Sequence, residues 1–135
     1  MDFMKQYEGQ SYALLRIVSG FLFIFHGADK FLKLTGMAPY ENLGVDAPVW
    51  MSQTGLACSI EIVCGAMIMI GLYSSIAAFL SSGLMAGAYW LIHFSKMGGG
   101  WPANNKGELA VMFCFAFLYI AAKGSGMWSV DSKRH

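Results

Sequence analysis

Residues 62–95 read IVCGAMIMIGLYSSIAAFLSSGLMAGAYWLIHFS and contain no Asp, Glu, Lys or Arg. The run is interrupted only by GLYSS at 71–75, where Gly and Ser are typical of a turn. A helix needs about 20 mostly apolar residues to cross a lipid bilayer. The run therefore predicts two membrane-spanning helices, 52–72 and 75–93, joined by a tight turn.

Two further apolar segments, 12–34 and 107–123, lie on either side of this pair. The chain of 135 residues is 56% hydrophobic and only 13% charged, whereas a soluble domain carries about 25% charged residues. We therefore expect a single all-α domain over 1–135, an integral membrane four-helix bundle with up-and-down topology. Nine basic residues against eight acidic ones exclude a nucleic-acid-binding protein.

Four spans place both termini on the same side of the membrane. The basic residues at the two ends of the helices nearly balance, five against four, and slightly favour termini in the cytoplasm. The first apolar run is too long for the core of a signal peptide. We expect a multi-pass protein of the cell inner membrane whose long connections, 35–51 and 94–106, lie together on the opposite face.

Ionisable side chains inside the predicted spans need a partner or a purpose, because each costs roughly 2.5 to 3.5 kcal/mol near the bilayer centre. They are Arg16, His26 and Lys30 in the first span, Glu61 in the second, His93 in the third and Glu108 at the start of the fourth. At about 1.5 Å per residue, all but Arg16 fall in the half of the membrane nearer the long connections. The sequence thus predicts a polar cluster in that half.

Helical spacing predicts which residues share a face with this cluster. One stripe in the third span comprises Ser82, Ala86, Tyr89 and His93. A second stripe, in the fourth span, comprises Glu108, Met112, Phe115 and Tyr119. Both stripes are expected to face neighbouring helices. Gly83 and Gly87 form a small-xxx-small pair, which predicts close helix packing within the bundle or between protomers.

Three interpretations of the polar cluster remain open. It can be a structural network that fixes helix register, or a cavity for a quinone or a similar lipid-soluble ligand with a polar head. It can also be a zinc, iron or manganese site formed by His26, His93, Glu61 and Glu108. The spacing does not favour a metal, since no two of these candidates share a helix at i, i+3 or i, i+4.

The quinone interpretation assigns a role to each polar residue. His26 and His93 exchange protons, Glu61 and Glu108 tune them, and Lys30 stabilises the reduced oxyanion. These five are the predicted catalytic residues. We expect further contacts to the ligand from four residues, namely Arg16, Tyr89, Trp101 and Asn104.

Several motifs taken together resemble the DoxX family of small four-helix membrane proteins. They are LLRIVSGFLFIFHGADKF at 14–31, the Glu61 segment that ends in GLYSS, AYWLIH at 88–93, and NNKGELAVMF followed by GSGMWSVD. The resemblance covers nearly the whole chain in the expected order. It implies an up-and-down bundle and membership in a family that includes the small subunit of a thiosulfate:quinone oxidoreductase or terminal quinol oxidase.

Two functional hypotheses follow. In the first, the protein is a subunit or accessory of a membrane redox system with an intramembrane site for a quinone-like ligand, served by a soluble redox partner. In the second, it is a non-enzymatic membrane scaffold whose polar network is structural and whose connections, with Trp50 and Trp101, dock a partner protein. A homo-oligomer is compatible with both hypotheses.

Overall fold

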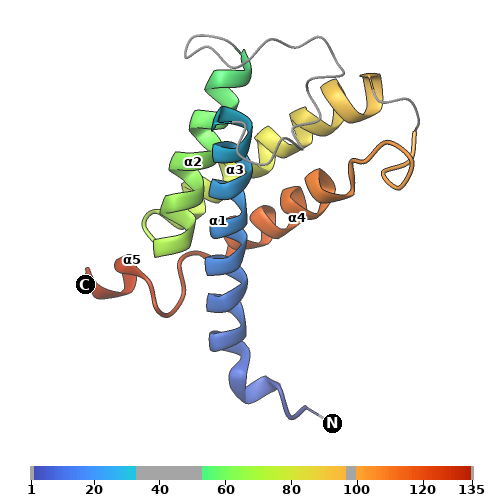
Figure 1. Ribbon diagram of the computed structural model, residues 1–135. Helices are drawn as coiled ribbons and strands as arrows, with labels where there is room; N and C mark the ends of the chain where they lie inside the picture. The colour runs from blue at the N-terminus through green and yellow to red at the C-terminus, as the bar shows by residue number, and fades with distance from the viewer. Residues whose placement is uncertain (1, 33–52, 97–99, 135) are drawn as a thin grey trace.

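The computed structural model describes residues 2–32, 53–96 and 100–134. Every regular element in these ranges is a helix (Figure 1), which confirms the predicted all-α class for the described chain. The elements are η1 Lys5–Tyr7, α1 Glu8–Leu32, α2 Gln53–Ile70, α3 Ser74–Ala88, the π-helix η3 Tyr89–Phe94, α4 Glu108–Lys123 and α5 Val130–Lys133. The first long helix begins at Glu8 instead of residue 12, since an acidic residue in the first turn favours helix initiation.

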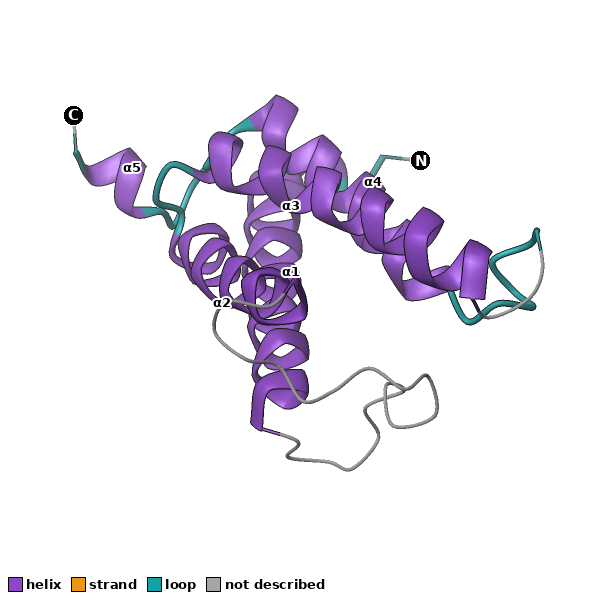
Figure 2. Cartoon of the chain, turned by 90° about the horizontal axis from the view of Figure 1, so that it is seen from above, coloured by secondary structure: helices purple, strands orange, loops and turns teal. Residues whose placement is uncertain are grey.

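The four long helices form two pairs that cross. α1 packs mainly along α2, and α3 packs mainly along α4. Seen from above, α3 and α4 run side by side and lead away from α1 towards the connection between them (Figure 2). Phe23 of α1 joins the pairs, because its ring lies 5.5 Å from that of Phe113 and 4.7 Å from that of Phe117 on α4. An up-and-down bundle with all four helices aligned stays a prediction.

Glycines allow α1 and α2 to approach closely. A Cβ at Gly20 would lie 2.6 Å from the Met69 nitrogen and 2.7 Å from the Gly65 oxygen, so backbone atoms fill the space that a side chain would need. By contrast, no atom of the described residues lies within 4 Å of the corresponding positions at Gly83 or Gly87. Gly83 and Gly87 therefore do not mark close packing within the described chain, and close packing between protomers, the other alternative, stays a prediction.

The predicted tight turn joins α2 to α3. Gly71 (φ 76°) and Tyr73 (φ 48°) both have left-handed backbone conformations, which glycine adopts without steric cost. The short C-terminal helix α5 docks on this turn. The backbone N–H of Tyr73 donates to the Asp131 carboxylate at 2.8 Å, and the Asp131 N–H donates to the Gly71 carbonyl at 3.0 Å.

The docking of α5 is expected to weaken in acid. The Ser125 hydroxyl donates to the Asp131 carboxylate at 2.6 Å and lowers the pKa of that group, and the Tyr73 N–H lowers it further. A carboxyl with a lowered pKa contributes stability that is complete above the unfolded value of about 3.9 and is lost as pH falls through the folded value. The protection of the amides of residues 125–134 against exchange, relative to the unstructured chain at the same pH, should therefore fall below about pH 4. Asp131→Asn should abolish that pH dependence, and an unchanged profile would contradict this account.

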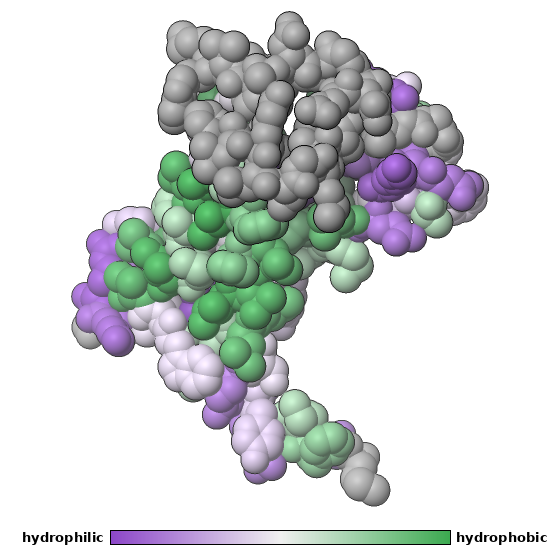
Figure 3. Space-filling view, in the orientation of Figure 1, coloured by the Kyte–Doolittle hydropathy of each residue, from purple (hydrophilic) through white to green (hydrophobic). Residues whose placement is uncertain are grey.

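Two helical segments are long and apolar enough to cross a membrane, Lys5–Asp29 with 25 residues and Ser74–Phe94 with 21. Gly55–Ile70 is a shorter apolar helix. Large apolar side chains are exposed along these helices, among them Phe21 and Phe25 on α1 and Phe79 on α3. Figure 3 shows hydrophobic residues over the middle of the helices, hydrophilic ones towards α5, and both kinds at the N-terminal end. This surface suits lipid as its solvent.

Candidate functional site

Three polar side chains meet where α3 passes through η3 towards α4. The ring of His93 places Nδ1 3.1 Å from the backbone oxygen of Asn105. The amide of Asn105 donates to the Tyr89 hydroxyl at 3.3 Å, and its Oδ1 accepts the N–H of Gly107 at 3.0 Å. Asn105 is fully buried at 0% exposure and His93 is half-buried. We call Tyr89, His93 and Asn105 the loop-end cluster.

The π-helix gives His93 its orientation. Over Tyr89–Phe94 the backbone turns more widely than an α-helix, and such segments are rare and frequent at functional sites. The rings of Tyr89 and His93 stack with centroids 6.5 Å apart. Trp90 and Phe94 lie on the same segment with ring centroids 5.0 Å apart, and both are exposed. The histidine is thus flanked by aromatic surface.

The segment before α4 is shaped to place Asn105 under the histidine. Lys106 has a left-handed backbone (φ 58°), which is uncommon for a residue other than glycine. A Cβ at Gly107 would lie 2.6 Å from the Tyr89 ring, so only glycine fits there. Sequence reasoning named Asn104 as the ligand contact, but Asn104 is exposed and the buried member is Asn105. Because Asn104 and Asn105 are adjacent and identical, the sequence does not show which of them is buried.

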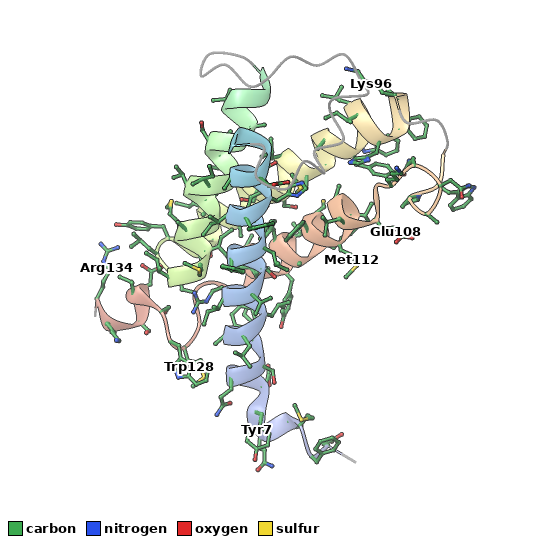
Figure 4. The ribbon with its side chains drawn as sticks, in the orientation of Figure 1. Tyr7, Lys96, Glu108, Met112, Trp128 and Arg134 are labelled. Atoms are coloured by element: carbon green, nitrogen blue, oxygen red, sulfur yellow. The ribbon has the colours of Figure 1, made fainter. Side chains whose placement is uncertain are left out.

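The other sequence-predicted residues of this end point outward. Glu108 and Met112 lie on the side of α4 away from α3 (Figure 4). Met112 is 69% exposed, and Phe115 and Tyr119 further along α4 are exposed as well. The prediction that this stripe faces neighbouring helices is therefore wrong for Glu108, Met112 and Phe115 within the described chain. Its last member, Tyr119, does contact α1, because its ring lies 5.7 Å from that of Tyr12. Ser82 of the α3 stripe donates to the Cys114 carbonyl of α4 at 2.7 Å. Trp101 is 74% exposed.

His26 and Glu61 lie on the other helix pair. Glu61 is buried between α1 and α2, since a Cβ at Gly27 would lie 2.8 Å from the Glu61 Cβ. His26 precedes Gly27 and is half-buried. Lys30 follows on α1, and its side chain lies outside the described residues, as do Trp50 and its connection. In Figure 1 the ends of α3 and α4 that carry the loop-end cluster lie apart from α1 and α2.

Arg16 occupies the opposite end of the molecule, and its guanidinium donates to four backbone carbonyls. Its Nη1 donates to the carbonyls of Ile68 and Met69, both at 2.7 Å. Its Nη2 donates to Met127 at 3.2 Å and to Trp128 at 2.8 Å. The side chain is fully buried. This arrangement, the Arg16 clamp, joins α1 to the end of α2 and to the segment before α5.

No three His, Cys, Asp or Glu side chains of the described ranges come close enough together to hold a metal ion. His26 and Glu61 lie on the α1–α2 pair, and His93 and Glu108 lie near the outer ends of α3 and α4. The four residues of the metal interpretation are thus divided between two helix pairs. Within the described chain, the geometry assembles a hydrogen-bonded histidine and no metal-ligand set.

Comparison with known proteins identifies the family. The sequence profile named DoxX matches residues 11–94, more than half of the chain. The protein belongs to the DoxX family. The match includes Arg16, His26, Glu61, Tyr89 and His93 and ends before Asn105 and Glu108. No solved structure matches the chain.

Three relatives of this DoxX protein span most of its length. An uncharacterised protein of Haemophilus influenzae is 35% identical over 134 residues, covering 98% of this chain and 97% of that protein. An uncharacterised membrane protein of Mycobacterium tuberculosis is 25% identical, covering 88% and 78%. A Bacillus subtilis protein named "Putative oxidoreductase CatD" is 23% identical, covering 87% and 82%. The family and the name of the Mycobacterium tuberculosis relative agree with a membrane location.

Proposed function

We propose that this DoxX protein is a subunit or accessory of a membrane redox system that binds the head of a quinone-like ligand at the loop-end cluster. The observation that carries the proposal is the hydrogen bond between His93 Nδ1 and the Asn105 carbonyl. A carbonyl oxygen only accepts, so Nδ1 carries the proton and Nε2 of the neutral ring has a lone pair. Such a ring accepts a proton at Nε2 and passes it on.

The surroundings of His93 support a flat, lipid-soluble ligand. Exposed rings of Trp90 and Phe94 on the same π-helix supply aromatic surface for stacking. Reduction of a quinone to the quinol consumes two electrons and two protons. A partner redox protein supplies the two electrons. His93, protonated at Nε2 from water, gives one proton to one quinone oxygen, and water supplies the second proton to the other oxygen. The name of the Bacillus subtilis relative favours redox chemistry. Roles for His26, Lys30, Glu61 and Glu108 in the same reaction stay predictions.

Quinone binding by the purified protein in nanodiscs tests the proposal. His93→Ala should weaken the binding of a short-chain quinone analogue by about tenfold, the worth of one hydrogen bond in a buried site. Asn105→Asp should weaken it less, because the carbonyl that orients His93 is a backbone group and is retained. Met112→Ala, on the outer face of α4, serves as the control and should bind normally. Equal affinity in His93→Ala and the control would contradict the proposal.

A scaffold function is the second candidate, and the Arg16 clamp favours it. Arg16 was predicted to contact the ligand, but it is the most deeply buried cation of the described chain and donates to backbone carbonyls. This predicted ligand contact therefore stabilises the fold. Exposed Trp101 then fits a docking residue for a soluble partner. If the protein is a scaffold, the unsubstituted protein should bind quinone too weakly to measure. Trp101→Ala should then lower the amount of partner protein that the membrane protein captures.

A further inference from the structure

A groove of about 480 Å³ lies between the start of α1 and the end of α4, remote from the loop-end cluster. Its polar lining comprises Lys5, Glu8, Ser11, Tyr12, Tyr119 and Lys123. The Tyr12 hydroxyl donates to the Gly124 carbonyl and holds the two helices together beside the groove. Because both helices belong to a membrane protein and reach their charged ends here, the groove lies where a headgroup layer meets the apolar core.

The charges in the groove favour an anion. Lys123 Nζ lies 3.0 Å from Glu8 Oε1, and it lies 5.0 Å from the centre of the Tyr12 ring and 5.9 Å from that of Tyr119. Lys5 is the second cation of the lining and Glu8 is its one acidic residue. Two ammonium groups against one carboxylate leave a net charge of +1. The exposed Glu8 carboxylate already occupies the position that a phosphate would take next to Lys123.

Both walls of the groove become apolar away from its charged end, along two helices that run in different directions from there (Figure 1). On α1, Ser11 is followed at helical spacing by the exposed Leu15 and Leu22. On α4, Lys123 and Tyr119 are followed towards the helix start by the exposed Phe115. The salt bridge between Glu8 and Lys123 shows that the start of α1 meets the end of α4. The groove therefore continues as two apolar stripes leading away from its charged end.

We propose that this groove binds an anionic phospholipid, with the phosphate on Lys123 and Lys5 and the acyl chains along Leu15 and Phe115. A polar end with net positive charge and two apolar stripes match the two parts of such a lipid. Tyr12 and Tyr119 contribute the amphipathic rings that favour the membrane interface. The lipid phosphate displaces the Glu8 carboxylate from Lys123, so Glu8 competes with the phosphate for that ammonium group.

Native mass spectrometry of the full chain released from nanodiscs tests the lipid site. With equal amounts of phosphatidylglycerol and phosphatidylcholine, the protein should retain phosphatidylglycerol preferentially. Lys123→Gln should reduce that retention by about fivefold, as expected for one basic residue at an anionic surface. Lys133→Gln makes the same change on α5 outside the groove and should leave retention unchanged.

A second variant separates lipid binding from damage to the fold. Glu8→Gln and Lys123→Gln break the same salt bridge, so any general loss of structure is common to both. Their effects on retention should be opposite, since Glu8→Gln removes the competitor and should raise retention. A fall in both variants, equal retention of the two lipids, or an equal effect of Lys133→Gln would overturn the proposal. Complete release of the lipid by inorganic phosphate would also overturn the proposal, because the acyl chains would then contribute nothing to binding.

Discussion

Arg16→Met should lower the free energy of unfolding in mild detergent by about 3 kcal/mol or more. The variant keeps an unbranched apolar stem but removes every donor of the Arg16 clamp. Four carbonyl oxygens, on Ile68, Met69, Met127 and Trp128, then lose a charged hydrogen-bond donor inside the protein. A buried acceptor left unsatisfied costs roughly 1 to 3 kcal/mol, and some of the four will regain partial partners.

The clamp also predicts where the damage appears. Because Arg16 is the bond between α1 and residues 127–128, the C-terminal segment should become sensitive to protease while α3 and α4 stay folded. Arg134→Met is the matched control and should change the melting temperature little, since among the described residues its exposed guanidinium contacts Tyr73 and Asp131 at the surface. Arg16→Lys should fall between, because an ammonium group lacks the planar fork that reaches several carbonyls. Equal melting temperatures of Arg16→Met and Arg134→Met would refute the clamp as a structural element.

Gly20→Ala should be the second severe substitution, although it adds a single methyl group. The new Cβ would meet the Met69 nitrogen, the Gly65 oxygen and the Met69 Cα, all backbone atoms within 3 Å. Backbone atoms in a packed helix pair cannot move aside as a flexible side chain can, so α1 and α2 must separate along their length. Overpacking of this kind costs typically 1 to 3 kcal/mol, and we expect a value near the upper end.

Gly83→Ala is the control for Gly20→Ala because it makes the same chemical change on an open helix face. With no described atom within 4 Å of the new Cβ, the higher helix propensity of Ala should leave stability unchanged or raise it by up to about 1 kcal/mol. Thermal unfolding followed by circular dichroism in detergent measures both variants. If Gly20→Ala is as stable as Gly83→Ala, α1 and α2 do not pack through Gly20. If Gly83→Ala is the less stable of the two variants, the face of α3 that carries Gly83 packs against another protein chain.

The loop-end cluster illustrates how far sequence reasoning reaches into a site. Helical spacing put Tyr89 and His93 on one stripe, and their rings do stack. The cluster also depends on Asn105, whose position under His93 depends on the left-handed backbone of Lys106 and on the lack of a side chain at Gly107. Neither feature has a periodic signal, because the segment between the helices has no regular repeat. Sequence reasoning therefore selected the neighbouring Asn104.

The orientation of Glu108 differs from the expected one for a related reason. Spacing along a helix shows which residues share a face, but it does not show which face meets another helix. On α4 the buried face comprises Ala110, Phe113, Phe117 and Ile120. Glu108 and Met112 face outward instead (Figure 4), and Phe115 is exposed. In a soluble protein polarity would have distinguished the two faces. In lipid both faces are apolar, so hydropathy carries no such information.

The sequence by itself determined the helical class, the turn at 71–73 and the membrane as solvent, since these follow from the length of apolar runs and the conformational freedom of Gly and Ser. Tertiary structure alone decided what the polar residues do. Arg16 finds its acceptors 52 to 112 positions further along the chain, and His93 receives its orientation from a carbonyl in the next connection. Backbone carbonyls are present at every residue, so only the packing of α1, α2 and the C-terminal segment selects the ones that a buried cation can reach.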